Sequence, residues 1–328
     1  MNDTGTWGCG AAALALLLAV QGSAAAQGAK PWRHSIIEAK SDAGIFMTIG
    51  KGFAEKQGLK LEIVQFKTDI IELQALLAGD IDSFDGGPAA GMVAAAHGAD
   101  VKLIGCEWPG VPYGVFVRPT IATPQDLKGK IFAISSPGAN PDVVARAVLM
   151  KFNVQVEDVR FANLGSDLDR FKAVVAGVAD ATVVSSEYTP IAEKQGVKML
   201  LRASDVVPDF MRICIFTTGK LIATRGDDAA RFMAAEMTAL SYALAHREET
   251  LALTRETTGA KPDDPRPGFI FDDAVNTNAI DPEMHIPMDK LQWMEEQALR
   301  DKVLAQPYDV AKLVDPSVRQ KALALLSK

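Results

Sequence analysis

Four short segments rich in Gly, Ser and Asn each follow a predicted strand and precede a predicted helix. They are Lys40-Ser41-Asp42-Ala43-Gly44, Gly86-Gly87-Pro88-Ala89, Ser135-Ser136-Pro137-Gly138-Ala139-Asn140 and Ser185-Ser186-Glu187-Tyr188. In open α/β sheets, ligands bind beyond the carboxyl ends of the strands and against helix N-termini. Because free N–H groups and the helix dipole favour negative charge there, these segments predict a site for a carboxylate or sulfonate.

Twelve residues from these segments and the adjoining strands are the expected ligand contacts. They are Ser41, Asp42, Gly87, Pro88, Trp108, Ser136, Gly138, Ala139, Asn140, Ser186, Tyr188 and Arg212. Taken singly, each serine is explained more simply as a helix N-cap. Gly87 is equally typical of a tight turn, and Asn140 of an Asx-turn before a proline.

Two aromatic residues and one arginine among these twelve suggest how an organic acid is held. Trp108 and Tyr188 offer flat faces on which an aromatic ligand would stack. The guanidinium of Arg212 would bind a carboxylate in bidentate fashion. Arg212 has an alternative partner in Asp209, three residues earlier, and a surface ion pair of that kind would contribute little.

Strands alternate with helices through much of the chain. Apolar alternation predicts strands at 34–39, 59–66, 83–85, 101–106, 130–135, 156–161, 181–184 and 198–201. Helical periodicity predicts helices at 45–57, 70–78, 88–97, 141–152, 167–176, 186–195, 229–246, 248–257 and 287–303. Such alternation requires parallel sheets with right-handed crossovers, so the fold class is α/β. The stretch 259–287 is predicted to be a long loop with a helical turn near 272–276.

An internal repeat divides the chain. Ala75-Leu76-Leu77-Ala78-Gly79 with Asp82 recurs 98 residues later as Ala173-Val174-Val175-Ala176-Gly177 with Asp180. Each copy spans about 70 residues, the size of one Rossmann-like lobe, and a cleft between two lobes binds small molecules. Extended runs at 113–118 and 212–217 are expected to cross between the lobes as a two-stranded hinge. Lobe 1 would then comprise 30–117 plus about 219–328, where the C-terminal helices pack, and lobe 2 would comprise 118–218.

The N-terminus and the composition constrain location and partners. The apolar run 11–20 is too short to span a bilayer, and Ala24-x-Ala26 follows it, so residues 1–26 are predicted to be a signal peptide despite the absence of Lys and Arg. The net charge of −7 and the lack of a basic patch exclude a nucleic-acid partner. We therefore expect a protein exported to the periplasm.

Cysteines and histidines give no sign of a cofactor. Cys9 precedes the apolar run, so it is not the acylated cysteine of a lipoprotein. Cys106 and Cys214 lie in apolar runs typical of free buried thiols, which we expect, while a disulfide is the alternative in an oxidising compartment. The four histidines are scattered without the spacing of a metal site, so no metal and no cofactor is expected.

Four motifs together resemble a known family. Gly52–Leu61 resembles "G-(F/Y)-F-x-x-x-G-L-x-V", and Asp126–Ile131 resembles "D-L-K-G-K". With the two Ala-Gly-x-x-Asp motifs of the repeat, they match the periplasmic solute-binding proteins for nitrate, sulfonates, taurine, aromatic acids and thiamine precursors, from about residue 30 to the end. The resemblance implies a two-lobed venus-flytrap fold (the type II periplasmic binding protein fold) that delivers ligand to an ABC importer.

These observations predict a monomeric periplasmic binding protein that captures a small organic anion, a carboxylate or sulfonate, aromatic or aliphatic, by hinge closure. Its expected partner is an ABC permease at the inner membrane. A thiamine-pyrimidine-precursor binder is the alternative, and an enzyme on the same fold is less expected. The chain lacks the nucleophile and metal motifs of hydrolases and the cysteine-rich iron cluster of the related pyrimidine-forming enzyme. A transcription regulator would need a helix-turn-helix before the first lobe, which these N-terminal residues do not supply.

Overall fold

The computed structural model describes residues 30–37, 40–66 and 68–327. The predicted signal peptide and Cys9 lie outside these residues. Within the described part, no helix has the length and apolar character needed to cross a bilayer.

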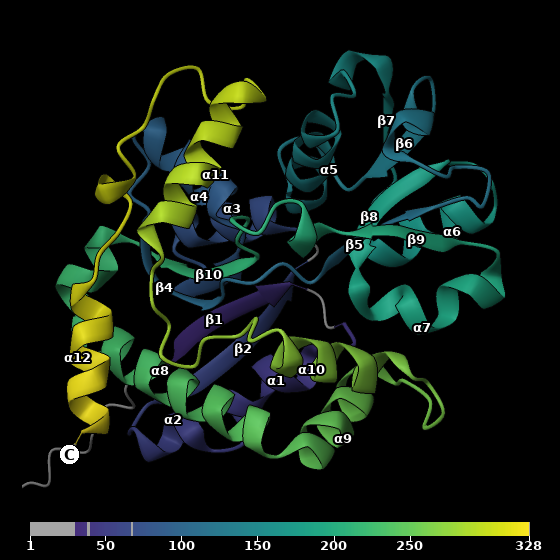
Figure 1. Ribbon diagram of the computed structural model, residues 1–328. Helices are drawn as coiled ribbons and strands as arrows, with labels where there is room; N and C mark the ends of the chain where they lie inside the picture. The colour runs from purple at the N-terminus through teal and green to yellow at the C-terminus, as the bar shows by residue number, and fades with distance from the viewer. Residues whose placement is uncertain (1–29, 38–39, 67, 328) are drawn as a thin grey trace, which may run out of the picture. The chain divides into compact units, whose positions relative to one another are not determined.

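The first sheet has the strand order β2-β1-β3-β10-β4 (Figure 1). Its strands are β1 (Trp32–Ile37), β2 (Leu61–Phe66), β3 (Ser83–Gly86), β4 (Lys102–Trp108) and β10 (Ile213–Thr217). β1 pairs in parallel with β2 and β3, whereas β10 runs antiparallel to both β3 and β4. We call this sheet and its helices the first lobe.

The second sheet repeats this plan in the order β7-β6-β8-β5-β9. Its strands are β5 (Tyr113–Val117), β6 (Ile131–Ile134), β7 (Arg160–Asn163), β8 (Ala181–Ser185) and β9 (Lys198–Arg202). Here β5 is the antiparallel strand, between β8 and β9. We call this sheet and its helices the second lobe. The α/β class is confirmed, but each sheet is mixed, because one strand of each enters from the other half of the chain.

Helices cover both sheets. In the first lobe they are α1 (Ala43–Met47), α2 (Phe53–Lys56), α3 (Asp69–Ala78), α4 (Pro88–Ala96), α8 (Gly219–Ala245), α9 (Arg247–Thr258), α10 (Arg266–Asn276), α11 (Met288–Arg300) and α12 (Ser317–Leu326). In the second lobe they are α5 (Asn140–Lys151), α6 (Asp167–Val175) and α7 (Thr189–Ala192). The long, Ala-rich α8 packs on β1, where Phe232 stacks on Trp32 with ring centroids 5.7 Å apart.

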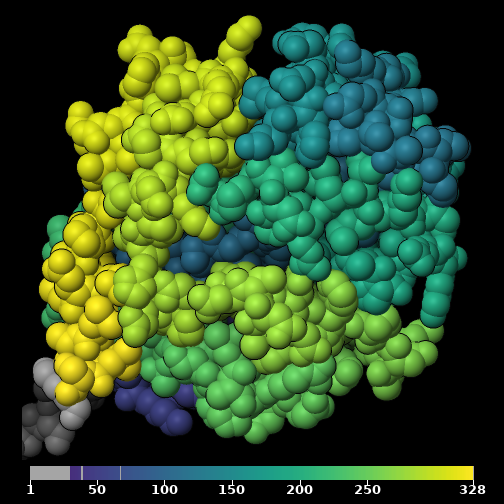
Figure 2. All heavy atoms as spheres, in the orientation of Figure 1, coloured from purple at the N-terminus to yellow at the C-terminus, as the bar shows by residue number. Residues whose placement is uncertain are grey.

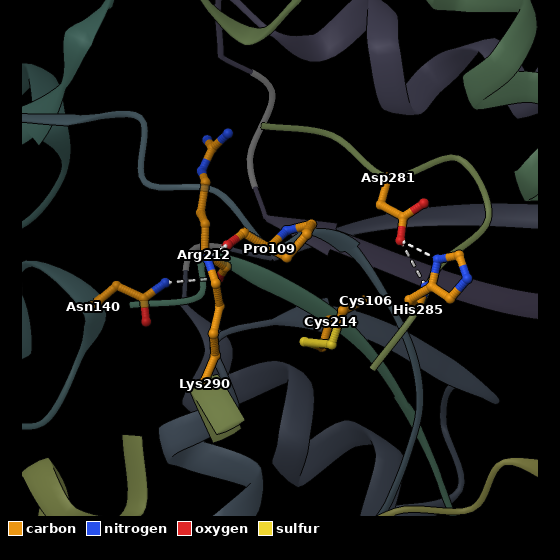
Figure 3. Close-up of a disulfide and its surroundings, with 8 residues drawn as sticks. All are labelled: Cys106, Pro109, Asn140, Arg212, Cys214, Asp281, His285 and Lys290. Atoms are coloured by element: carbon orange, nitrogen blue, oxygen red, sulfur yellow. Dashed lines mark hydrogen bonds and ion pairs between the residues drawn. A yellow bond between two sulfur atoms is a disulfide. The ribbon is translucent and has the colours of Figure 1, made fainter. Parts of the chain in front are cut away.

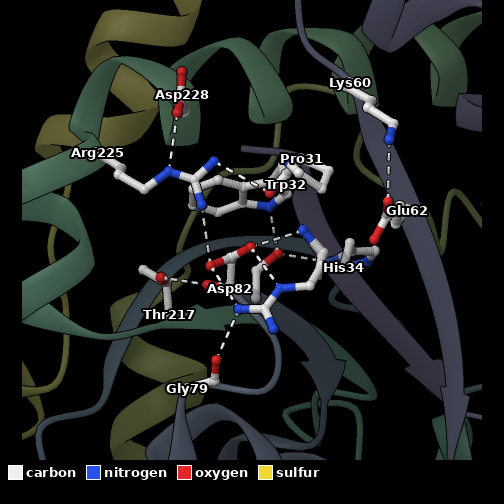
Figure 4. A network of polar contacts seen from close by, with 12 residues as sticks. Pro31, Trp32, His34, Lys60, Glu62, Gly79, Asp82, Thr217, Arg225 and Asp228 are labelled. Carbon is white, nitrogen blue, oxygen red and sulfur yellow. Dashed lines mark hydrogen bonds and ion pairs between the residues drawn. The ribbon is translucent and has the colours of Figure 1, made fainter. Parts of the chain in front are cut away.

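The repeat found in the sequence is a structural repeat. Oδ2 of Asp82 accepts a 2.8 Å bond from the backbone N–H of Arg33, whose carbonyl accepts a 2.7 Å bond from the N–H of Asp82. The equivalent bonds join Asp180 to Ile131, at 2.9 and 2.8 Å, 98 residues further along the chain. Each aspartate thus ties the strand that it precedes to a neighbouring parallel strand, β3 to β1 in the first lobe and β8 to β6 in the second. Asp82 also pairs with Arg225 of α8, 3.1 Å away (Figure 4).

The expected hinge strands are members of the sheets. β5 lies in the second sheet and β10 in the first, so the chain passes between the sheets at 109–112 and 203–212, a few residues before the expected crossings. We call 109–112 and 203–212 the connecting segments. The prediction of two free thiols is also wrong: Cys106 of β4 and Cys214 of β10 form a disulfide, with Cα atoms 3.9 Å apart (Figure 3). They meet because β10 inserts beside β4.

Several helical predictions differ from the structure. The helix predicted at 186–195 consists of a 3-10 turn (Ser186–Tyr188), the short α7 and a second 3-10 turn (Glu193–Gln195). The helix predicted at 45–57 is divided into α1, a 3-10 turn (Thr48–Gly50) and α2, with Gly52 at a left-handed φ of 87° between them. The predicted loop 259–287 contains the full helix α10. No helix was expected where α12 lies. The C-terminal helices α8, α9 and α12 pack on the first lobe, and α10 and α11 also contact the second lobe.

Candidate functional site

A cavity of about 60 Å³ lies where the two lobes meet. It is bounded by the carboxyl ends of β1 and β3, the start of α5, and the first residues of β5 and β10. Its lining residues are Ile36, Ile37, Lys40, Asp42, Ala43, Phe46, Asp85, Gly86, Gly87, Tyr113, Asn140, Arg212 and Ile213. This is the position at which α/β sheets bind ligands.

Arg212 is the best-anchored cation of this cavity. Its Nη2 lies 2.6 Å from Oδ2 of Asp42, and its guanidinium stacks 4.2 Å above the Trp108 ring. Burial would lower the pKa of Arg212, but the charge of Asp42, followed by Tyr113, raises it above its ordinary value. Nη1 of Arg212 is buried and has no hydrogen-bond partner among the described residues. The side chain is therefore a fixed, permanently charged donor with one N–H group available.

Lys40 links the first lobe to the second. Its Nζ lies 3.4 Å from Oδ2 of Asp167, at the first turn of α6. Burial would raise the pKa of Asp167, but Lys40 and then Arg170 outweigh that effect and hold it well below its usual range. Burial would likewise lower the pKa of Lys40, but Asp167 raises it above its usual value. Both groups remain ionised at neutral pH, so the pair is a charged contact between the lobes.

Asn140 and Gly87 bring the lobes together at the other side of the cavity. Nδ2 of Asn140, the first residue of α5, donates a 3.0 Å bond to the carbonyl of Arg212 (Figure 3). Its Oδ1 lies 2.2 Å from where a Cβ on Gly87 would stand. Gly87 has an ordinary extended backbone, with φ −68° and ψ 140°, so glycine is required here by close approach alone.

Two buried acids, one of them in its lining, adjoin the cavity. Asp85 of β3 lines the cavity, and the fully buried Glu107 of β4 lies behind it. Burial raises the pKa of Asp85 to about 7, and a side-chain hydrogen bond with Glu107 offsets part of that rise. Burial, and next the charge of Asp85, raises the pKa of Glu107 well above its usual value. Burial lowers the pKa of the neighbouring His34 to about 3, so that imidazole is neutral.

A second, larger cavity of about 310 Å³ lies against the connecting segments. Figure 2 shows it as a hollow between the C-terminal helices and the second lobe. Lys290 of α11 lines it and donates to the carbonyls of Pro109 and Pro208, at 3.0 and 2.9 Å, one on each connecting segment. Its polar side chains bond one another, as His285 does with Asp281 at 2.8 Å (Figure 3). The cavity between the strand ends is therefore the better candidate site.

The structure brings part of the predicted set together. Four of the twelve expected contacts line the cavity: Asp42, Gly87, Asn140 and Arg212. Trp108 supports Arg212 from below, and Pro88 opens α4 directly after Gly87. Three loop residues do not line the cavity: Ser136, Gly138 and Ala139. The backbone N–H of Gly138 donates to Asp142, and a Cβ at Gly138 would contact the side chain of Val303. Ser41 is buried beside Asp42 but is not among the lining residues either.

Two predicted residues of the second lobe have other partners. Ser186 Oγ donates a 2.7 Å bond to Asp273 of α10, which also accepts a 2.6 Å bond from Arg202. Tyr188 is buried against Phe171, with stacked rings 4.5 Å apart. Ser186 therefore joins the second lobe to α10, and Tyr188 belongs to the hydrophobic core. The helix α10 that engages Ser186 lies in the stretch predicted to be a loop.

Sequence reasoning missed several lining residues, among them Lys40, Phe46 and Asp85. Lys40 opens one of the four strand-end segments, and Asp85 ends a predicted strand, so position alone could have included both. Phe46 falls inside a predicted helix and had no such signal.

Comparison with known proteins places the chain in a family. The model of the NMT1/THI5-like family matches residues 40–250, more than half of the chain. The protein belongs to the NMT1/THI5-like family. This confirms the family resemblance of its motifs. No curated protein sequence matches the chain.

Solved structures resemble this NMT1/THI5-like chain in fold. The alkanesulfonate-binding protein SsuA from Xanthomonas axonopodis pv. citri, bound to MOPS, has a TM-score of 0.73 at 19% identity, covering 88% of this chain and 99% of that one. The periplasmic nitrate-binding protein NrtA from Synechocystis has a TM-score of 0.72 at 13% identity, covering 91% and 89%. A mutant of DszB in complex with biphenyl-2-sulfinic acid has a TM-score of 0.66 at 15% identity, covering 89% and 99%. The fold is therefore the periplasmic binding protein fold.

Proposed function

We propose that the protein is the solute-binding component of an ABC importer and captures a small organic acid in the cavity between its lobes. The observation that carries this proposal is Arg212, which lines the cavity: a buried guanidinium, held by Asp42 and Trp108, whose Nη1 has no hydrogen-bond partner among the described residues. Guanidinium groups bind carboxylates and sulfonates with directed, charge-assisted hydrogen bonds. The family membership and the binding-protein fold support the same role.

The lobes must separate for such a ligand to enter. A cavity of about 60 Å³ holds a few water molecules and is well below the usual volume of an organic ligand site. An acid bound to Arg212 would also face Asn140 of the opposite lobe, whose amide can donate to it. Because a ligand that contacts both lobes stabilises the state in which they are close, binding would favour closure.

Direct contacts already join the lobes. Lys40 pairs with Asp167, and Asp273 accepts bonds from both Ser186 and Arg202. The first contact lies at the cavity and the second at the larger cavity beside Lys290. Both would break on opening, which gives the closed state a defined geometry for a permease to recognise. We extend the proposal to a periplasmic location, since the disulfide and the predicted signal peptide both suit an oxidising compartment.

We propose binding without turnover. The cysteines of the described chain are joined in the disulfide, so neither provides a thiolate nucleophile. Recovery of the bound compound chemically unchanged after prolonged incubation is the expected result, and its conversion would point to an enzyme.

A ligand panel tests the proposal. Aliphatic acids, aromatic acids, sulfonates, nitrate and thiamine precursors would be screened by thermal unfolding, where a ligand at 100 times its Kd adds about 2.7 kcal/mol. A melting temperature raised by roughly 5 °C or more for one acid class is the expected result. No shift with any acid, from protein first unfolded and refolded to remove bound compounds, would contradict the proposal.

Variants then locate the site. Removing Arg212 alone would leave Asp42 buried without its partner, a change expected to destabilise the fold by several kcal/mol. The double variant Asp42→Asn/Arg212→Met removes both charges together and should abolish binding of the best acid while the protein stays folded. Arg300→Met, at an exposed position of α11, is the matched control and should bind normally.

A further inference from the structure

We propose that Lys290 is a positioning residue for ligand capture. Its ammonium group holds the two connecting segments together when the lobes are close, and this contact sets how long a ligand stays bound. Lys290 is not among the residues that line the cavity between the strand ends, so it acts through the connecting segments and not by touching the ligand. This inference rests on the proposed function, because it concerns the closure that such binding requires.

Lys290 contacts both connecting segments at once. Its Nζ donates a 3.0 Å bond to the carbonyl of Pro109 (Figure 3) and a 2.9 Å bond to the carbonyl of Pro208. Lys290 forms no ion pair with any residue that the structure describes, so these two carbonyls are the groups that meet its charge. Hydrogen bonds from a charged donor are stronger than neutral ones. One side chain thus links the two stretches of chain that join the lobes.

The place of Lys290 in its helix is unfavourable for a lysine. It lies in the first turn of α11, directly after Asp289. The helix dipole favours acidic residues such as Asp289 in that turn and disfavours a positive charge there. A residue that breaks a local preference of its own helix is explained by contacts elsewhere, and the contacts of Lys290 are the two carbonyls of the connecting segments.

The loop between α10 and α11 fixes the position from which Lys290 reaches out. The backbone N–H of Gly110 donates a 3.0 Å bond to the carbonyl of Ala279, and the N–H of Asp281 donates a 2.8 Å bond to the carbonyl of Glu107. The loop is therefore bound to the end of β4 and to the first connecting segment. Because α11 begins only a few residues later, Lys290 is held in place relative to the first lobe.

The two bonds of Lys290 respond differently when the lobes separate. Pro109 directly follows β4, whose last residue, Trp108, pairs with Ile213 of β10, so this carbonyl is fixed to the first lobe. Pro208 lies within 203–212, the connecting segment that arrives from β9 of the second lobe. Opening requires backbone torsions in the connecting segments to change. The bond to Pro109 therefore anchors the ammonium group, and the bond to Pro208 breaks as the second lobe moves away.

A contact that exists only in the closed state slows ligand release. The ligand leaves after the lobes open, so loss of the contact raises the dissociation rate and changes the association rate little. Removing one charge-assisted hydrogen bond should raise the dissociation rate about tenfold. A lysine that served only the stability of α11 would instead lower the melting temperature and leave the dissociation rate of the folded protein unchanged.

Stopped-flow kinetics of Lys290 variants test this inference. The probe is the tightest binder among acetate, benzoate, ethanesulfonate and the other acids of the panel. Lys290→Met should release it about tenfold faster, with an association rate within about threefold of the wild type and a melting temperature within about 3 °C. Lys290→Arg keeps a charged donor for both carbonyls, so it should release the probe within about threefold of the wild-type rate. Lys312→Met, at an exposed position of the 3-10 turn Val310–Lys312, is the matched control and should not change either rate.

The outcomes separate this inference from the proposed function. A wild-type dissociation rate in Lys290→Met, or slower association together with a lowered melting temperature, would overturn the inference and leave organic-acid binding in place. Failure of every acid to bind the wild type would overturn the proposed function. X-ray scattering of the ligand-free proteins then decides on Lys290 without a ligand: a larger radius of gyration in Lys290→Met than in the wild type and Lys290→Arg would support its contact between the segments, and equal radii would overturn it.

Discussion

Loss of the disulfide between Cys106 and Cys214 should destabilise the protein substantially. The cross-link joins residues 108 positions apart, and closing a loop of about 100 residues in the unfolded chain contributes about 4.7 kcal/mol of stability. At roughly 2 °C per kcal/mol for a chain of this size, the double variant Cys106→Ala/Cys214→Ala should melt about 10 °C below the wild type. Calorimetric melting of both proteins, with and without reductant after brief unfolding, measures the effect.

Internal controls make this prediction specific. The reduced wild type should melt near the double variant, because both lack the cross-link, while reductant should leave the double variant unchanged. Since the two cysteines are fully buried within the first sheet and do not line the cavity, ligand affinity should change less than threefold. A double variant that melts within 2 °C of the oxidised wild type would refute the loop-closure argument.

Three further predictions concern closure and pH. Gly87→Ala places a Cβ 2.2 Å from Oδ1 of Asn140, so it should hinder closure and weaken ligand binding at least tenfold by calorimetry; wild-type affinity in Gly87→Ala would contradict this. Asp273→Asn removes the charge that accepts from Ser186 and Arg202 of the second lobe, so the ligand-free protein should show a larger radius of gyration in X-ray scattering. An unchanged radius would show that this contact does not hold the lobes together. Stability to urea should fall from pH 6.5 to 9, because burial raises the pKa of Asp85 to about 7 and of Glu72 to about 9. The folded protein holds these protons and the unfolded chain does not, so the stability present at low pH is lost as pH rises through the folded pKa values; a flat or rising profile would be inconsistent with protonated buried carboxyls.

The repeat allowed much of the fold to be predicted from the sequence. Asp82 and Asp180 occupy equivalent positions because each binds the backbone of the neighbouring parallel strand, so a motif repeated at one spacing indicated a repeated architecture. The same local patterns could not show which sheet a strand joins. β5 and β10 were recognised as extended, but their exchange between the sheets depends on long-range pairing, and the Cys106–Cys214 disulfide follows from that exchange.

The site was predicted in part for the same reason. Strand ends and helix starts indicated Asp42, Gly87 and Asn140, which line the cavity, because topology brings those positions to one edge. Ser186 had the same local signal but is bonded to α10, a helix whose Pro- and Asp-rich sequence favoured a loop. Glu107 lies in an apolar strand, where only the packing of distant elements shows which acids it meets.

A crystal structure of the protein grown with its tightest-binding organic acid tests the central claim most directly. We predict density in the cavity between the lobes, with the acid group within hydrogen-bonding distance of Nη1 of Arg212 and in contact with Asn140. Density in the larger cavity beside Lys290, with the space at Arg212 filled only by water, would contradict the account.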